Sequence, residues 1–234
     1  MKSHSCKWGA HAGTGMGFPE PQQPTLKHQT TTPQFHPIST KPIIMGATTL
    51  LILDIQNGIV DNFDQSITEP YLQRLAKTIA AARNESINII HVVTAFRLGY
   101  LDVHPLNASS GPITATGKYQ EGSADVQIHP AVNRLPTEPI VTKRRVSAFV
   151  GTELDLLLRC SGTDHLVVAG IATSGAVLST IRQAQDLDFH ITVLRDLCLD
   201  RDEEVHRVLI DKVFGRKTDV FNAEEWVDRI KASS

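Results

Sequence analysis

Short apolar runs alternate with longer amphipathic segments along most of this chain, and that alternation limits the folds open to it. Each run is continuous and too short for a typical helix, which predicts strands buried on both faces of a sheet. The runs cover residues 48–55, 87–96, 139–143, 165–171, 189–196 and 218–221. Helical spacing of apolar side chains marks residues 69–86, 151–160, 175–188, 203–214 and 223–232. We therefore expect a three-layer α/β/α fold with a doubly wound, mostly parallel sheet.

Two further features refine this outline. The first expected helix has Thr68 as a candidate N-cap and Pro70 in its first turn, an arrangement that favours helix initiation. A long polar segment, residues 97–133, interrupts the alternation before the third strand.

The N-terminal residues 1–47 differ in composition from the rest of the chain. They are rich in Pro, Gly, Gln, Thr and His and show no apolar periodicity, which is typical of a flexible extension. The alternating pattern begins at Thr48. We therefore expect a flexible extension over residues 1–47 and one domain over residues 48–234.

Charge and cysteine content restrict the partners and the compartment. The 23 basic residues nearly balance the 25 acidic ones, so no strong field favours nucleic acid or an anionic membrane. No apolar run approaches the roughly 20 residues that a membrane-spanning helix needs. The 3 cysteines are widely spaced and suggest neither a disulfide framework nor a metal motif. We expect a cytoplasmic protein that acts on a small molecule.

Ligands of parallel sheets bind beyond the carboxyl ends of the strands, so polar residues at those ends are the candidates for a site. Asp54 follows an unbroken apolar run, and a carboxylate there must be paired or neutralised. Lys143 ends the third run. The fourth run ends in a turn that enters a helix at Ala176, where an α/β enzyme would present its nucleophile. We expect Asp54, Lys143 and Ala176 to surround one pocket.

Four more residues are candidates for the walls of that pocket: Arg97, Tyr100, Asn107 and Phe149. Of these, Arg97 follows the second strand and has the planar fork that holds a carboxylate through two hydrogen bonds.

No cofactor is predicted. Neither a dinucleotide fingerprint nor a phosphate-binding loop follows the first strand. Asp102 and His104 are metal-ligand types, but they stand in a polar loop without an identifiable third ligand, so we predict no metal. Cys198 lies within an apolar stretch and is interpreted as a small buried thiol.

Three stretches together resemble the isochorismatase-like hydrolase superfamily. They are "LLILDIQNGIV", "VTKRRVSAFVGTELDLLLR" and "GIATSGAVLSTIRQAQDLDF", and the likeness covers essentially residues 48–230. The resemblance implies a six-stranded parallel sheet of order 3-2-1-4-5-6 and a homo-oligomer. It also implies a cis peptide between Ile171 and Ala172, with the backbone N–H groups of Ala172 and Ala176 forming an oxyanion hole.

The cysteine hydrolases of this superfamily use an Asp, a Lys and a Cys, and the resemblance assigns these positions to Asp54, Lys143 and Ala176. A methyl group cannot attack a carbonyl, so the amidase reaction does not transfer to this chain. True isochorismatases resemble this pattern, with a small residue in place of the cysteine. Their reaction needs an acid that protonates a vinyl ether, here Asp54, followed by capture of water.

Three interpretations of Ala176 remain open from the sequence. The chain is a hydrolase that acts on a small carboxylated molecule without a covalent cysteine intermediate, which is the interpretation we favour. Alternatively, it is an amidase in which a cysteine was replaced by engineering. The third possibility is a non-catalytic relative that binds small molecules or serves as a scaffold.

Overall fold

The structure, a computed structural model, describes residues 46–232, so most of the predicted flexible extension, residues 1–47, lies outside the described residues. Its centre is a six-stranded sheet of order β3-β2-β1-β4-β5-β6, in which every neighbouring pair is parallel. The strands are β1 (Ala47–Leu53), β2 (Asn88–Thr94), β3 (Ile140–Lys143), β4 (Thr163–Ile171), β5 (His190–Leu199) and β6 (Asp219–Phe221). The predicted fold class is confirmed.

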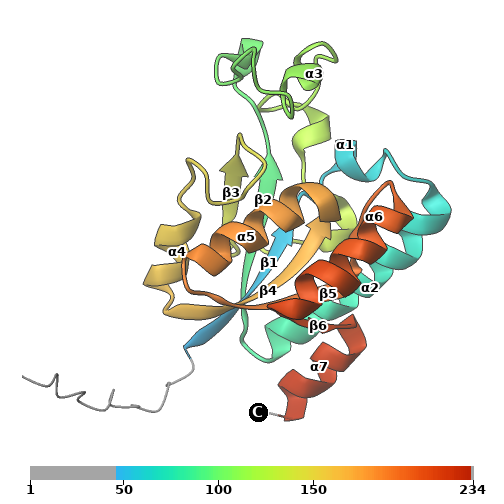
Figure 1. Cartoon of the computed structure of the whole chain (residues 1–234), viewed down its shortest axis with the longest axis vertical. Helices are drawn as coiled ribbons and strands as arrows, with labels where there is room; N and C mark the ends of the chain where they lie inside the picture. Colours follow the sequence, from blue (N-terminus) through green and yellow to red (C-terminus); the bar gives the residue numbers. More distant parts are fainter. Residues whose placement is uncertain (1–45, 233–234) are drawn as a thin grey trace, which may run out of the picture. The chain divides into compact units, whose positions relative to one another are not determined.

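Helices cover both faces of the sheet (Figure 1). One face of the sheet packs against α2 (Gln65–Asn84) and α7 (Ala223–Ala232). The core between them includes Leu50 and Ile52 of β1. Leu51 and Leu53 point to the other core, which α4 (Leu154–Cys160) and α5 (Leu178–Asp186) cover. Since successive strand residues face opposite sides, an unbroken apolar run supplies both cores. None of the helices in residues 46–232 is long and apolar enough to cross a membrane.

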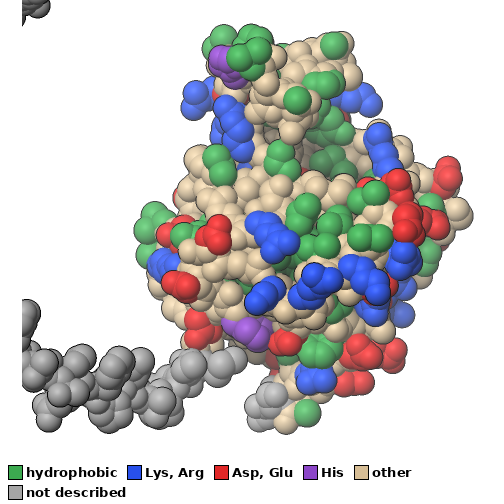
Figure 2. Space-filling model, viewed as in Figure 1, with side chains coloured by type: hydrophobic (Ala, Val, Ile, Leu, Met, Phe, Trp, Pro, Cys, Tyr) green, Lys and Arg blue, Asp and Glu red, His purple; other side chains and the backbone are tan. Residues whose placement is uncertain are grey.

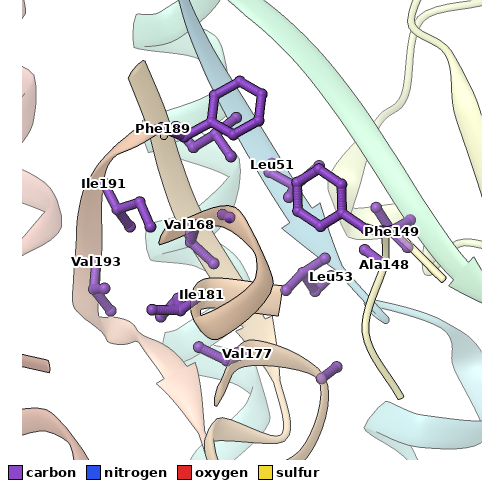
Figure 3. Close-up of a cluster of buried hydrophobic side chains, with 14 of the residues drawn as sticks. Leu51, Leu53, Ala148, Phe149, Val168, Val177, Ile181, Phe189, Ile191 and Val193 are labelled. Carbon is purple, nitrogen blue, oxygen red and sulfur yellow. The ribbon is translucent and has the colours of Figure 1, made fainter. Parts of the chain in front are cut away.

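The second core surrounds the turns that follow β3 and β4. Figure 3 shows Phe149 in this core together with Leu53, Val177 and Phe189. The rings of Phe149 and Phe189 lie 6.0 Å apart, a spacing typical of tilted aromatic pairs. This packing places the turn after β4 beside the end of β1.

Helix α2 begins earlier than the sequence suggested. It starts at Gln65, with Asp64 as the N-cap residue, so the prediction of Thr68 as the cap is wrong. Instead, Thr68 lies inside the helix, and its hydroxyl contacts the carbonyl of Asp64 at 3.4 Å. Pro70 lies beyond the first turn, within the helix.

Between β2 and β3 the chain leaves the sheet and forms an excursion that projects beyond the strand ends (Figure 1). It contains four short helical turns: η1 (Leu98–Tyr100), α3 (Gly111–Thr114), η2 (Ala124–Val126) and η3 (Pro130–Val132). Three leucines of the excursion are largely exposed, and Figure 2 shows hydrophobic side chains gathered at its tip. They are Leu98, Leu101 and Leu106, at 71%, 84% and 86% exposed. The excursion forms one wall of the cavity described next.

Candidate active site

Three strand ends meet in a buried polar cluster. Asp54 directly follows β1, Thr94 ends β2 and Lys143 ends β3, and these three strands are neighbours. The Lys143 Nζ lies 2.9 Å from the Asp54 Oδ2, and each of the two side chains is only 5% exposed. The Thr94 hydroxyl donates to the Asp54 Oδ1 at 3.0 Å and accepts from the Lys143 Nζ at 2.7 Å. A proton carried by this cluster is therefore shielded from bulk water.

The local backbone holds these groups in place. Asp54 has a φ of 58°, in the left-handed region, which Asp tolerates better than most residues. The fully buried Gln56 fixes Thr94, since its Oε1 accepts from the Thr94 N–H at 2.7 Å and its Nε2 donates to the Thr94 carbonyl at 3.0 Å. The cluster is thus supported by a second layer of hydrogen bonds.

The turn after β4 faces the same cluster. The peptide between Ile171 and Ala172 is cis, and a helical turn over Thr173–Val177 follows it. The Ala172 carbonyl accepts from the N–H groups of Gly175 and Val177 at 3.1 and 3.2 Å. Ala176 is 5% exposed and offers only a methyl group. The turn therefore has the shape of a nucleophile-bearing turn, but position 176 holds no nucleophile.

A cavity of about 680 Å³ opens beside these groups, a size that suits a small metabolite. Its walls include four of the residues predicted for the site: Asp54, Lys143, Ala172 and Ala176. The excursion and the loops after β3, β4 and β5 contribute further polar groups. They include Tyr119, Arg145, Ser174, Asp200 and Arg201.

Burial raises the pKa of Asp54 above its ordinary value of 3.8, and this effect outweighs the opposing influence of Lys143 and the Thr94 hydroxyl. A carboxyl group with few donors in a dry environment is harder to ionise than one in water. Asp54 is therefore suited to hold a proton and to release it into the cavity.

The isochorismatase domain family matches residues 48–225, which is most of the chain and includes the whole polar cluster. The chain belongs to the isochorismatase family. It is a hydrolase of that family. The superfamily resemblance found in the sequence is thereby confirmed.

Individual relatives are similar at a moderate level. An uncharacterised isochorismatase family protein, YwoC of Bacillus subtilis, is 31% identical over 83% of this chain and 100% of its own length. The ureidoacrylate amidohydrolase RutB of Variovorax paradoxus is 30% identical over 70% of this chain and 74% of its own. Among solved structures, an isochorismatase family protein of Desulfovibrio vulgaris superposes with a TM-score of 0.71 at 26% identity, covering 80% of this chain and 99% of that one.

The other four predicted wall residues of this isochorismatase-family hydrolase are not among the residues that line the cavity. Arg97 is exposed, and its backbone N–H is turned toward the carboxylate of Asp102. The Tyr100 hydroxyl donates to the Lys118 carbonyl at 2.7 Å. Asn107 closes a turn by accepting from two backbone N–H groups, and Phe149 is buried in the core.

Other cations take the place expected for Arg97. Four line the cavity in addition to Lys143: Lys118, Arg144, Arg145 and Arg201. Arg144 is bound to the carboxylates of Asp102 and Glu121, and the Arg145 guanidinium donates to two backbone carbonyls. Asp54 and Asp200 are the carboxylates of the described residues that line the cavity. Positive charge therefore predominates on its wall.

The two residues of metal-ligand type noted in the sequence, Asp102 and His104, make other contacts. Asp102 pairs with Arg144 at 2.7 Å, and the His104 Nδ1 accepts from the Leu106 N–H at 3.1 Å. Within residues 46–232, no group of three or more His, Cys, Asp or Glu side chains is placed to hold a metal ion. Burial raises the pKa of Cys198 to about 12, so this thiol is not ionised near neutral pH.

Proposed function

We propose that this hydrolase cleaves the vinyl ether of a small carboxylated molecule, with Asp54 as the acid and without a covalent enzyme intermediate. One observation carries the proposal: a buried aspartate with a raised pKa lines the cavity beside a turn whose position 176 holds alanine, with no nucleophilic group. A general acid works best when its pKa lies near the pH at which it operates, and burial moves Asp54 in that direction.

In the proposed reaction, Asp54 donates its proton to the terminal carbon of an enolpyruvyl group. The substrate becomes an oxocarbenium ion, water adds to it, and the resulting hemiketal breaks down into a 2-oxo acid and an alcohol. Lys143, 2.9 Å from Asp54, stabilises the carboxylate left by proton transfer. This chemistry needs only a small side chain at position 176.

The cations of the cavity wall support a carboxylated substrate. Lys118 and Arg201 are exposed side chains that line the cavity, and neither forms an ion pair with another residue of the described part of the chain. A carboxylate that enters the cavity finds charge complementarity there without displacing an existing pair.

An amidase reaction is the competing proposal, because RutB of Variovorax paradoxus is named a ureidoacrylate amidohydrolase. That reaction on this scaffold would need a nucleophile at position 176. An Ala176→Cys variant separates the two proposals. We expect it to crowd the cavity, to lower vinyl-ether hydrolysis and to leave ureidoacrylate uncleaved. Strong amide turnover with a covalent adduct visible by mass spectrometry would instead support an amidase that had lost its cysteine.

The direct test is incubation of the protein with isochorismate and measurement of pyruvate, beside an Asp54→Asn variant and a parallel incubation with ureidoacrylate. We expect pyruvate from the unmodified protein and almost none from the variant. Equal turnover by the two proteins would refute the role of Asp54. Absence of pyruvate from both would contradict the proposed reaction and favour a binding or scaffold role.

A further inference from the structure

A second carboxylate, Asp200, also lines the cavity, and its pKa is shifted in the opposite direction to that of Asp54. Asp200 directly follows β5, and the parallel register that pairs Ile171 with Leu199 brings it beside the turn that follows β4. Its Oδ2 accepts from the Ser174 N–H at 2.7 Å, and its Oδ1 accepts from the Asp202 N–H at 3.4 Å. Asp200 is thus hydrogen-bonded to the same turn that contains Ala176.

From this placement, we infer that Asp200 is the general base that holds and deprotonates the water adding to the oxocarbenium carbon. The inference rests on the proposed function and assigns its second step. A carboxylate offers about four acceptor positions, so one can hold a water while the others keep the backbone contacts. Asp200 is only partly buried and lines the cavity, so water reaches it.

The two carboxylates have opposite protonation preferences. Partial burial acts to raise the pKa of Asp200, but hydrogen bonds from Ser174 and from backbone N–H groups outweigh it and hold the pKa below 3.8. Two carboxyl groups whose surroundings move their pKa values apart form the usual acid and base pair of a hydrolase site. A weak base is sufficient here because an oxocarbenium ion is strongly electrophilic.

His206, which contacts the turn after β4, is an alternative base, and its position argues against it. The His206 Nδ1 lies 2.8 Å from the hydroxyl of the fully buried Thr173, which occupies that ring nitrogen. His206 is not among the residues that line the cavity, whereas Asp200 is.

The proton balance of the reaction closes with these two groups. Asp54 gives its proton to the vinyl carbon, which becomes a methyl group. Water forms the new C–O bond and passes a proton to Asp200. The hemiketal then breaks its bond to the alcohol oxygen, which takes the proton from Asp200, while the hemiketal hydroxyl proton returns to Asp54. The products are a 2-oxo acid and an alcohol, and both carboxyl groups regain their starting states.

An Asp200→Asn variant tests this role, because asparagine keeps an acceptor for the Ser174 N–H but is not a base. We expect pyruvate formation from isochorismate to fall about 10²-fold, within the range for loss of a general base. The matched control is Asp202→Asn, in the same loop but outside the cavity lining. Asp202 caps α6 (Glu203–Val208) by accepting from the Val205 N–H at 3.0 Å, and asparagine caps helices equally well. The control should keep its rate within about twofold.

Deuterium exchange distinguishes a base from a residue that merely supports the turn. In D₂O, slow water capture lets the oxocarbenium ion return to substrate, so isochorismate recovered from Asp200→Asn should carry deuterium at its vinyl carbon. The Asp54→Asn variant should give neither pyruvate nor deuterium. An unchanged rate in Asp200→Asn, or a lowered rate without deuterium in the recovered substrate, would overturn the assignment. Failure of the proposed function is seen separately, as absence of pyruvate from the unmodified protein.

Discussion

Two buried carboxylates lie at opposite ends of β3, and they behave in opposite ways. Glu138 precedes the strand, and Asp54 pairs with Lys143 at its end. Glu138 accepts from Arg83 at 2.7 and 3.1 Å, from the Leu135 N–H at 3.1 Å, and pairs with the His91 ring at 2.8 Å. Asp54 has one ammonium group and one hydroxyl group as partners.

The number of donors decides the charge state. Burial acts to raise the pKa of both carboxyl groups. For Glu138 the hydrogen bonds from Arg83, His91 and Leu135 outweigh burial, and its pKa falls below 4.5. The partners of Asp54 do not outweigh burial, and its pKa rises. A fully satisfied carboxylate stabilises the fold, whereas an under-satisfied one beside a cavity can exchange a proton with a ligand.

Substitutions of Asp54 and Glu138 should differ most in their effect on activity. Asp54→Asn should lower kcat for vinyl-ether hydrolysis by about 10²–10⁴-fold, the range for loss of a general acid. Glu138→Gln should leave kcat within about threefold when assayed at a temperature where the variant is folded. Both values come from initial rates of pyruvate formation. A comparable loss in Glu138→Gln would break the comparison.

For the free energy of unfolding, we expect the substitution of Glu138 to have the larger effect. A lowered pKa means that folding favours ionised Glu138, so Glu138→Gln should lower the free energy of unfolding by about 3 kcal/mol, as expected for a broken buried ion pair. A raised pKa means that folding favours neutral Asp54, so Asp54→Asn should cost much less at neutral pH. Urea unfolding of the two variants measures both values. A larger loss in Asp54→Asn would contradict the assigned pKa directions.

The pH dependence of kcat tests the protonation of Asp54 directly. The acid must carry its proton to act, so activity should be high at a pH below the raised pKa of Asp54 at which Asp200 is still ionised, and it should be lost as pH rises through the raised pKa. Above that pKa, kcat should fall about tenfold per pH unit, the slope for a single proton. A pH–rate profile of the unmodified protein measures this slope, and Asp200→Asn should keep it. Activity that rises with pH over this range would show that ionised Asp54 is the active form.

The smallest expected effect concerns His91. Burial lowers the pKa of His91 below 6.5, despite the nearby Glu138. As pH falls below 6.5, the unfolded chain therefore gains a proton that the folded chain does not, and stability decreases. The slope from this one group is at most about 1.4 kcal/mol per pH unit. Unfolding free energies of the unmodified protein and of His91→Asn between pH 7 and pH 5 should differ in slope, and equal slopes would exclude this contribution.

The sequence predicts the sheet well because apolar runs directly report buried strands. Asp54 and Lys143 were both predicted beside one pocket because the rule for strand ends in parallel sheets needs no knowledge of loop paths. Thr94 was missed because it reads as one more strand residue, although its hydroxyl links the ion pair. Its position gave a usable signal, because Thr94 is a polar residue at the end of a strand whose two neighbouring strands end in, or are directly followed by, charged residues.

The loops could not be predicted in the same way. Lys118 and Arg201 line the cavity from segments without periodicity, so their positions depend on tertiary contacts that a sequence pattern does not encode. Phe149 follows the third strand closely, but the chain turns back and its ring packs into the core. Thr68 looked like a helix cap, but α2 begins at Gln65, and the side chain of the preceding Asp64 makes no capping hydrogen bond, so local capping chemistry did not mark the start of this helix.

Gly170 precedes the turn that holds Ala176, and the two positions should differ in how well they tolerate substitution. Its φ of 152° is rare for residues with a side chain, and a Cβ there would overlap the carbonyl of Leu53, immediately before Asp54. In a library of variants selected only for folding, even alanine at position 170 should be purged, whereas several small residues at position 176 should survive. Substitutions that accumulate in this stretch can therefore change the reactive group at position 176 while the conformation of the backbone stays the same.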